Sequence, residues 1–81
     1  MMTRAFIFLN TEAKADFGIM LKKFRDDFQG SLLESYVLYG MYDMVLKLEA
    51  RSPNELRYKV EQVRKYDKVS STHTMIILDD S

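Results

Sequence analysis

Residues 4–10, Arg-Ala-Phe-Ile-Phe-Leu-Asn, are rich in aromatic and branched apolar side chains, a pattern typical of a buried β-strand. Side chains alternate along a strand, so Ala5, Ile7 and Leu9 lie on one side and the two phenylalanines on the other. Both sides of this strand are therefore apolar. Whatever sheet contains the strand must keep both of its faces from water.

Two amphipathic helices follow from the spacing of the other apolar residues. In residues 13–28, apolar side chains recur three and four positions apart, opposite charged ones. A second helix begins at Ser52, whose hydroxyl can accept a hydrogen bond from the amide of Glu55, and Pro53 suits the first helical position. This helix frays near residues 66–67. Its solvated side is expected to carry Arg57, Glu61, Arg64 and Lys65.

Three more strands complete the set of elements. They are expected over residues 32–39, 43–50 and 69–78, with Asp79-Asp80-Ser81 as a short acidic tail. The first two form an antiparallel hairpin through residues 40–42. Alternation places Leu32 and Tyr36 on one side of the sheet, and it places Thr72 and Thr74 on the side opposite His73.

The order strand, helix, strand, strand, helix, strand favours one arrangement under the right-handed crossover rule. This is the α+β ferredoxin-like βαββαβ sandwich, a four-stranded antiparallel sheet with both helices on one face, formed by residues 1–81 as a single domain. Two helices leave the other face of the sheet uncovered and apolar. We therefore expect a homodimer of the dimeric αβ-barrel type, with the sheets packed face to face; a monomer with scattered exposed aromatics is the alternative.

Composition narrows the possible partners of this 81-residue chain. Twelve basic and twelve acidic residues give a net charge of zero, which argues against direct binding to nucleic acid or to an anionic membrane. No apolar run approaches the roughly 20 residues that cross a bilayer, so a cytoplasmic location is expected. Without cysteine and with one histidine, the usual thiolate zinc sites are excluded, and neither a metal nor a cofactor is expected.

Residues suited to catalysis are scarce, so no catalytic residue is assigned. The adjacent pairs Asp26-Asp27 and Asp79-Asp80 carry diverging side chains, unlike a general acid and base. His73 lacks a catalytic or metal-binding partner, and it is interpreted as a packed or interface residue. The three glycines form no phosphate-binding loop.

Two weaker signals remain. In the stretch 40–43, Gly40 permits a tight turn with an exposed amide, and Asp43 can accept from an ammonium group or cap local amides. The hydroxyls of Thr72 and Thr74, on one face of the last strand, suit a carboxylate or an amide. From the residues alone, ordinary hairpin chemistry is the favoured explanation of the turn, and strand propensity is the alternative explanation of the threonines.

Two stretches together resemble a known family. Residues 39–50, Tyr-Gly-Met-Tyr-Asp-Met-Val-Leu-Lys-Leu-Glu-Ala, and residues 69–74, Val-Ser-Ser-Thr-His-Thr, resemble the effector-binding domain of the Lrp/AsnC family, also called RAM for regulation of amino-acid metabolism. The resemblance covers essentially all 81 residues. Its most specific part is the Gly-x-Tyr-Asp turn before an apolar strand, with the threonine pair about thirty positions later.

This resemblance implies a ferredoxin-like fold, dimers formed through the sheets, and rings that commonly contain four dimers, hence an octamer, with amino-acid effectors held between dimers. The ligand-binding residues it implies are Gly40, Met41, Tyr42, Asp43, Thr72 and Thr74. Gly40 would offer backbone contact, Asp43 would orient the turn or meet an ammonium group, and the threonines would bind the polar end of the ligand. His73 replaces a residue that is usually small or apolar, which leaves its role open.

Family regulators carry an N-terminal helix-turn-helix, whereas this chain opens with its first strand and resembles the stand-alone form. The expected function is therefore non-enzymatic. The module would bind a small amino acid between dimers and modulate transcriptional regulation through oligomerisation, alone or with a full-length Lrp/AsnC regulator, without binding DNA directly. One alternative is a cofactor-free oxygenase or isomerase that uses Tyr36, Tyr39 or His73 in a cavity between helices and sheet. Another is a structural ring-forming protein.

Overall fold

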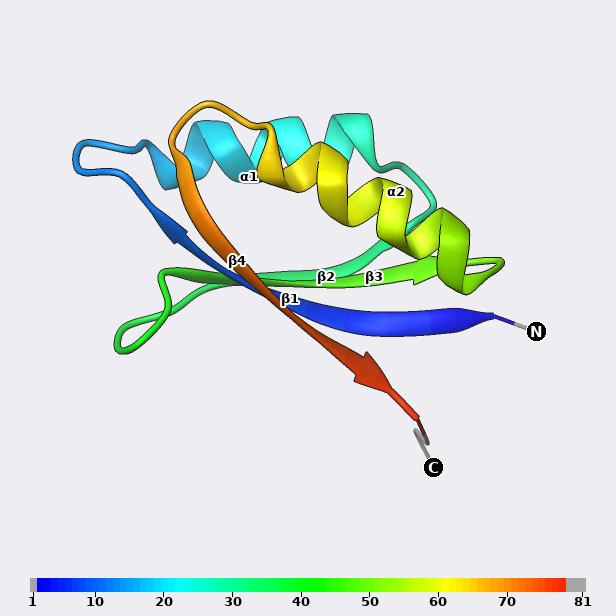
Figure 1. Ribbon diagram of the computed structural model, residues 1–81. Helices are drawn as coiled ribbons and strands as arrows, with labels where there is room; N and C mark the ends of the chain where they lie inside the picture. The colour runs from blue at the N-terminus through cyan, green and yellow to red at the C-terminus, as the bar shows by residue number, and fades with distance from the viewer. Residues whose placement is uncertain (1, 79–81) are drawn as a thin grey trace.

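Six elements follow one another in the expected order in the computed structural model, which describes residues 2–78. They are β1 (Thr3–Thr11), α1 (Phe17–Asp27), β2 (Leu32–Val37), β3 (Met44–Ala50), α2 (Pro53–Arg64) and β4 (Val69–Ile77). The strands form one antiparallel sheet in the order β2-β3-β1-β4, and both helices lie on one side of it (Figure 1). The predicted ferredoxin-like fold is confirmed. The predicted acidic tail, Asp79-Asp80-Ser81, lies outside the described residues.

The core fills the space between the sheet and the helices. Strand β1 contributes Ala5, Ile7 and Leu9, all fully buried, as their alternation predicts. The other core side chains are Met44, Leu46, Leu48 and Ala50 of β3, Met20 and Phe24 of α1 with Phe28 just after it, and Leu56, Val60 and Val63 of α2. Two strands, β1 and β3, and both helices therefore contribute to one core.

Helix α1 begins at Phe17, four residues later than the sequence predicts. The Asp16 carboxylate accepts a hydrogen bond from the amide of Ile19 at 3.0 Å and caps the helix there. Lys14 has a φ of +69°, which a right-handed helix does not allow. The apolar spacing that runs back to Ala13 therefore continues into a turn. The predicted start of α2 is confirmed, with the Ser52 Oγ accepting from the Glu55 amide at 3.1 Å.

Strand β2 contains an irregularity that the sequence pattern did not predict. The pairing register shifts between Leu32 and Glu34, so Leu32 lies opposite Leu48 and Tyr36 opposite Val45. Because the shift inserts one residue, Leu32 faces the helices and Tyr36 faces away from them. The prediction that these two residues share a face is wrong. In β4 the register shifts between Val69 and Ser71 and is regular from Ser71 to Ile77, so Thr72 and Thr74 face the helices while His73 does not.

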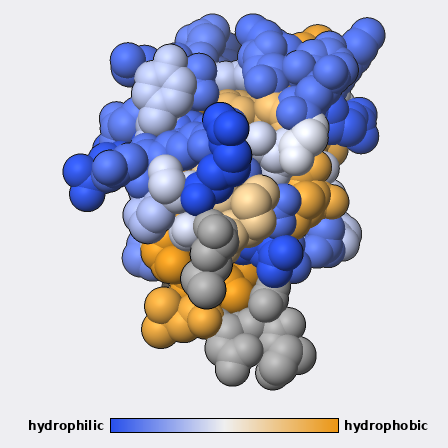
Figure 2. Space-filling model, turned by 90° about the vertical axis from the view of Figure 1, so that its right-hand side faces the viewer, coloured by the Kyte–Doolittle hydropathy of each residue, from blue (hydrophilic) through white to orange (hydrophobic). Residues whose placement is uncertain are grey.

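The side of the sheet without helices, here called the open face, is apolar at its centre. It carries Phe6, Phe8, Tyr36, Val45, His73 and Met75, together with Tyr42 from the β2–β3 loop. Tyr36 and Met75 are each 54% exposed. Ion pairs join Arg4 to Glu49 at 2.7 Å and Lys47 to Glu34 at 3.5 Å at the margin of this face. In Figure 2 hydrophobic residues gather over the sheet, below the largely hydrophilic helices.

Candidate functional site

The loop between β2 and β3 contains the predicted turn residues, and Asp43 fixes its position. The Asp43 Oδ2 accepts hydrogen bonds from the Thr11 amide at 2.8 Å and from the Thr11 Oγ1 at 3.0 Å. The Asp43 amide donates to the Leu9 carbonyl at 3.0 Å, and its carbonyl accepts from the Leu38 amide at 2.8 Å. Asp43 therefore attaches the loop to the end of β1. Thr11 is not among the site residues predicted from the sequence, and its position at the end of a strand was the available signal.

The remaining loop residues divide between solvent and the open face. Gly40 has a φ of +149°, a conformation that other residues rarely adopt, although a Cβ there would meet no atom within 4 Å. Tyr39 and Met41 flank it and are almost fully exposed. Tyr42 instead turns onto the open face, where its ring lies 5.2 Å from Phe8 and 6.1 Å from His73 between centroids. The loop thus presents exposed side chains next to a glycine backbone.

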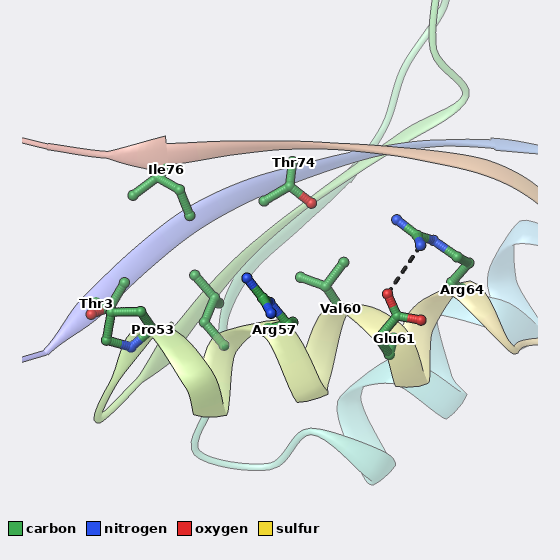
Figure 3. A pocket seen from close by; sticks show the side chains of 9 residues that line it. Thr3, Pro53, Arg57, Val60, Glu61, Arg64, Thr74 and Ile76 are labelled. Carbon is green, nitrogen blue, oxygen red and sulfur yellow. Dashed lines mark hydrogen bonds and ion pairs between the residues drawn. The ribbon is translucent and has the colours of Figure 1, made fainter.

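The predicted threonines belong to a different place, a groove of about 420 Å³ between α2 and β4 that we call the α2–β4 groove. Thr74 lines it, and its hydroxyl points toward α2 (Figure 3). The apolar wall consists of Leu56, Val60 and Ile76, and the other lining residues are Thr3, Pro53, Arg57, Glu61 and Arg64. Thr72 adjoins the groove through its Oγ1, which accepts from the Arg64 Nε at 3.3 Å.

Charged side chains of α2 form one edge of this groove. Arg64 donates to the Glu61 carboxylate at 3.0 Å (Figure 3), and it also donates to the Thr72 hydroxyl. Arg57 makes no hydrogen bond or ion pair with any of residues 2–78. These side chains are exposed, as the sequence predicts. Their three- and four-residue spacing marks one helix face, but only the packing of α2 beside β4 turns that face into the edge of a groove.

One chain does not bring the two parts of the predicted site together. Thr72 and Thr74 lie on the helix side of β4, whereas the Gly40–Asp43 turn bends away from the helices and Tyr42 packs on the open face (Figure 1). Asp43 also lies on the β3 side of β1, while β4 pairs with the opposite edge of β1. The two parts therefore do not form one site within a single chain.

The residues proposed for an enzymatic alternative do not share a cavity. Tyr36 and His73 lie on the open face, and Tyr39 is exposed at the loop tip. None lines a cavity between helices and sheet, so that placement is wrong. Among the described residues, no group of three or more His, Cys, Asp or Glu side chains could hold a metal ion, and no helix is long and apolar enough to span a bilayer.

Tyr66, whose pKa is strongly raised, lies away from both the Gly40–Asp43 turn and the α2–β4 groove. Burial, and then a hydrogen bond from its hydroxyl to the Asp27 carboxylate, raise the pKa of Tyr66 well above the ordinary tyrosine value. Its ring stacks on Phe24 at 4.5 Å between centroids. Tyr66 therefore joins the end of α1 to the segment before β4 and has a structural role.

Curated proteins match only parts of the sequence, and no family model matches it. A homocitrate synthase from Sulfurisphaera tokodaii is 46% identical over 39 residues, which are 48% of this chain and 8% of the enzyme. The HTH-type transcriptional regulator FL11 from Pyrococcus furiosus is 38% identical over 47 residues, 58% of this chain and 31% of that protein. The chain thus spans less than a third of either relative.

Solved structures match almost the whole chain. The crystal structure of an FFRP protein has a TM-score of 0.78 at 31% identity and covers 94% of this chain and 99% of its own. AsnC from E. coli has a TM-score of 0.79 at 23% identity, covering 96% of this chain and 52% of its own. A transcriptional regulator from Neisseria meningitidis, solved as its L-Met complex, has a TM-score of 0.77 at 18% identity, covering 96% and 51%.

The last two matches establish the shared fold, and the first adds sequence identity over nearly the full length of both chains. These matches agree with the Gly-x-Tyr-Asp turn and the observed strand order. The chain belongs to the Lrp/AsnC family, and it corresponds to the effector-binding RAM domain of that family.

Proposed function

We propose that this chain is a single ligand-binding domain over residues 1–81 that binds a small amino acid where two subunits meet. Ligand binding would change the assembly of the chain, alone or with a full-length Lrp/AsnC regulator, and thereby modulate transcription. The family membership supports a regulatory effector-binding role, and the related regulator from Neisseria meningitidis was solved with L-Met bound. The observation that carries the proposal is the separation of the two parts in one chain: the threonines lie on the helix side of β4, whereas the turn bends away from the helices.

The open face supports the first step of assembly. Its centre carries aromatic and aliphatic side chains, and large exposed apolar patches mark interaction surfaces. We propose that two sheets pack through this face as a homodimer. Burial of Tyr36 and Met75 would then supply part of the apolar core that a chain of this size otherwise lacks.

The second step would bring the loop of one dimer to the α2–β4 groove of another and close a ring, with an octamer as the expected size. The groove would supply the Thr74 hydroxyl and an apolar wall. The loop would supply the Gly40 backbone and the exposed Met41 side chain. A ligand held at such a boundary shifts the equilibrium toward the assembled form, because it binds that form better.

Complementation between defective subunits tests the shared site. Thr74→Val removes the hydroxyl from the groove, and Gly40→Val strains the loop where φ is +149°. Each variant alone is expected to lose amino-acid binding in calorimetry, whereas mixed oligomers of the two regain part of it because some boundaries combine intact halves. A mixture that stays inactive, despite demonstrated subunit exchange, would contradict a site between subunits. Absence of binding by all twenty amino acids to the parent chain would contradict the sensor itself.

The match to homocitrate synthase supports a second candidate, in which the same module regulates an enzyme rather than a transcription factor. Both candidates use one ligand site and differ in the protein that responds. Adding the chain with and without amino acid to a full-length Lrp/AsnC regulator, and separately to homocitrate synthase, distinguishes them. A change in operator binding supports the first candidate, and a change in the rate of synthesis supports the second.

A further inference from the structure

We propose that the α2–β4 groove selects small carboxylates that have an apolar tail, and that the guanidinium of Arg57 holds the carboxylate. This inference rests on the proposed function, because it takes the groove as one half of the ligand site. It adds a ligand class and a specificity-determining residue, and it predicts that ligands with basic side chains are rejected.

The charges along the edge of the groove carry the first step. Three charged side chains line it, and Glu61 and Arg64 neutralise one another through the 3.0 Å ion pair. Arg57 is exposed and has no partner among residues 2–78. The groove therefore keeps one uncompensated positive charge. A guanidinium presents paired donors that match the two oxygens of a carboxylate.

The uncharged side chains of the groove determine which groups the ligand carries besides its carboxylate. The Thr74 hydroxyl points toward α2 from the facing strand, and no hydrogen bond occupies it within the described chain (Figure 3). Leu56 and Val60 are buried beneath the groove, and Ile76 is half exposed beside it. The volume of about 420 Å³ suits a small molecule. An acid group would meet Arg57 and Thr74 while an apolar tail covers the aliphatic wall.

The groove offers little to a second positive charge. Its one carboxylate, that of Glu61, is already paired with Arg64. A lysine or arginine side chain entering the groove would meet the like charge of Arg57 without a free acidic partner. The α-ammonium group of an amino acid must therefore face the solvent or the second subunit. Recognition within this chain depends on the acid group, and the amino group is secondary.

Matched ligands test this class directly by calorimetry on the assembled chain. The probes are leucine, leucinamide, which lacks the carboxylate, 4-methyl-2-oxopentanoate, which lacks the amine, and lysine. Leucine and the oxo acid are expected to bind. Leucinamide is expected to bind at least roughly tenfold more weakly, the usual weight of a hydrogen bond to a charged group. Lysine is expected not to bind.

Two substitutions identify the anchor. Arg57→Gln should lower leucine affinity roughly tenfold or more and abolish the difference between leucine and leucinamide. Arg25→Gln makes the same change of charge in the last turn of α1, away from the groove, and should leave the affinity unchanged. Thermal unfolding of both variants and sedimentation of their oligomers establish that fold and assembly are intact.

The outcomes separate this inference from the proposed function. Leucine binding that is insensitive to both Arg57→Gln and amidation overturns the carboxylate anchor and leaves the sensor in place. Lysine binding without leucine binding overturns the ligand class. Failure of every amino acid to bind overturns the proposed function, whereas binding of the oxo acid alone still supports the role of Arg57.

Discussion

At the scale of single residues, Asp43 joins the loop to β1 through the amide and the hydroxyl of Thr11. We expect Asp43→Ala to lower the free energy of unfolding by about 1–3 kcal/mol, because two hydrogen bonds to a charged oxygen are lost. Urea unfolding followed by circular dichroism measures the change. Thr11→Ala is the matched control: it removes only the hydroxyl and should cost less. Equal stability of Asp43→Ala and the parent would show that the carboxylate does not hold the loop.

Tyr66 makes stability depend on pH on the alkaline side. Burial, with the bond to Asp27, raises the pKa of Tyr66 in the folded chain, so its contribution is complete below the unfolded value of about 10. Above that pH the unfolded chain loses the proton more readily than the folded chain does. The free energy of unfolding should therefore fall as pH rises beyond about 10, more steeply in the parent than in Tyr66→Phe. Urea titrations at several pH values measure the two slopes, and identical slopes would refute this role.

At the scale of elements, Ser52 determines where α2 begins. Ser52→Ala removes the acceptor for the Glu55 amide and should lower the free energy of unfolding by roughly 1 kcal/mol. Ser52→Asp supplies another cap and should preserve stability. Thermal and urea unfolding of the two variants test the difference. A stable alanine variant would mean that packing of Leu56 and Val60 fixes the helix start without the cap.

The observed helices and strands show which parts of the fold local sequence signals predict. Strand β1 and the start of α2 were predictable, because alternation and capping are local signals. The start of α1 was not, since apolar spacing runs through Ala13 while the cap at Asp16 ends the preceding turn. The face of Thr74 followed from alternation, and Arg57 is exposed as predicted. Their place in one groove was not predictable, because it depends on how α2 packs beside β4, which no local pattern encodes.

At the scale of the whole molecule, the open face is expected to control assembly. Phe8→Glu places a charge beside Tyr42 at the centre of this face and should convert the oligomer to monomers at micromolar concentration. Ile19→Glu changes an exposed apolar residue on α1 and should leave the oligomer intact. Sedimentation velocity distinguishes the species. A parent chain that is already monomeric, or a Phe8→Glu variant that sediments like the parent, would contradict packing through the sheets.

The separation of the threonines from the turn within one chain gives a shared site one further property. If each site needs two copies, dilution of the protein weakens the response even when the metabolite is abundant. The module would then act as a coincidence detector, sensitive to nutrient level and to its own cellular dosage. Changing the expression of the gene would reset the threshold without altering any residue that touches the ligand.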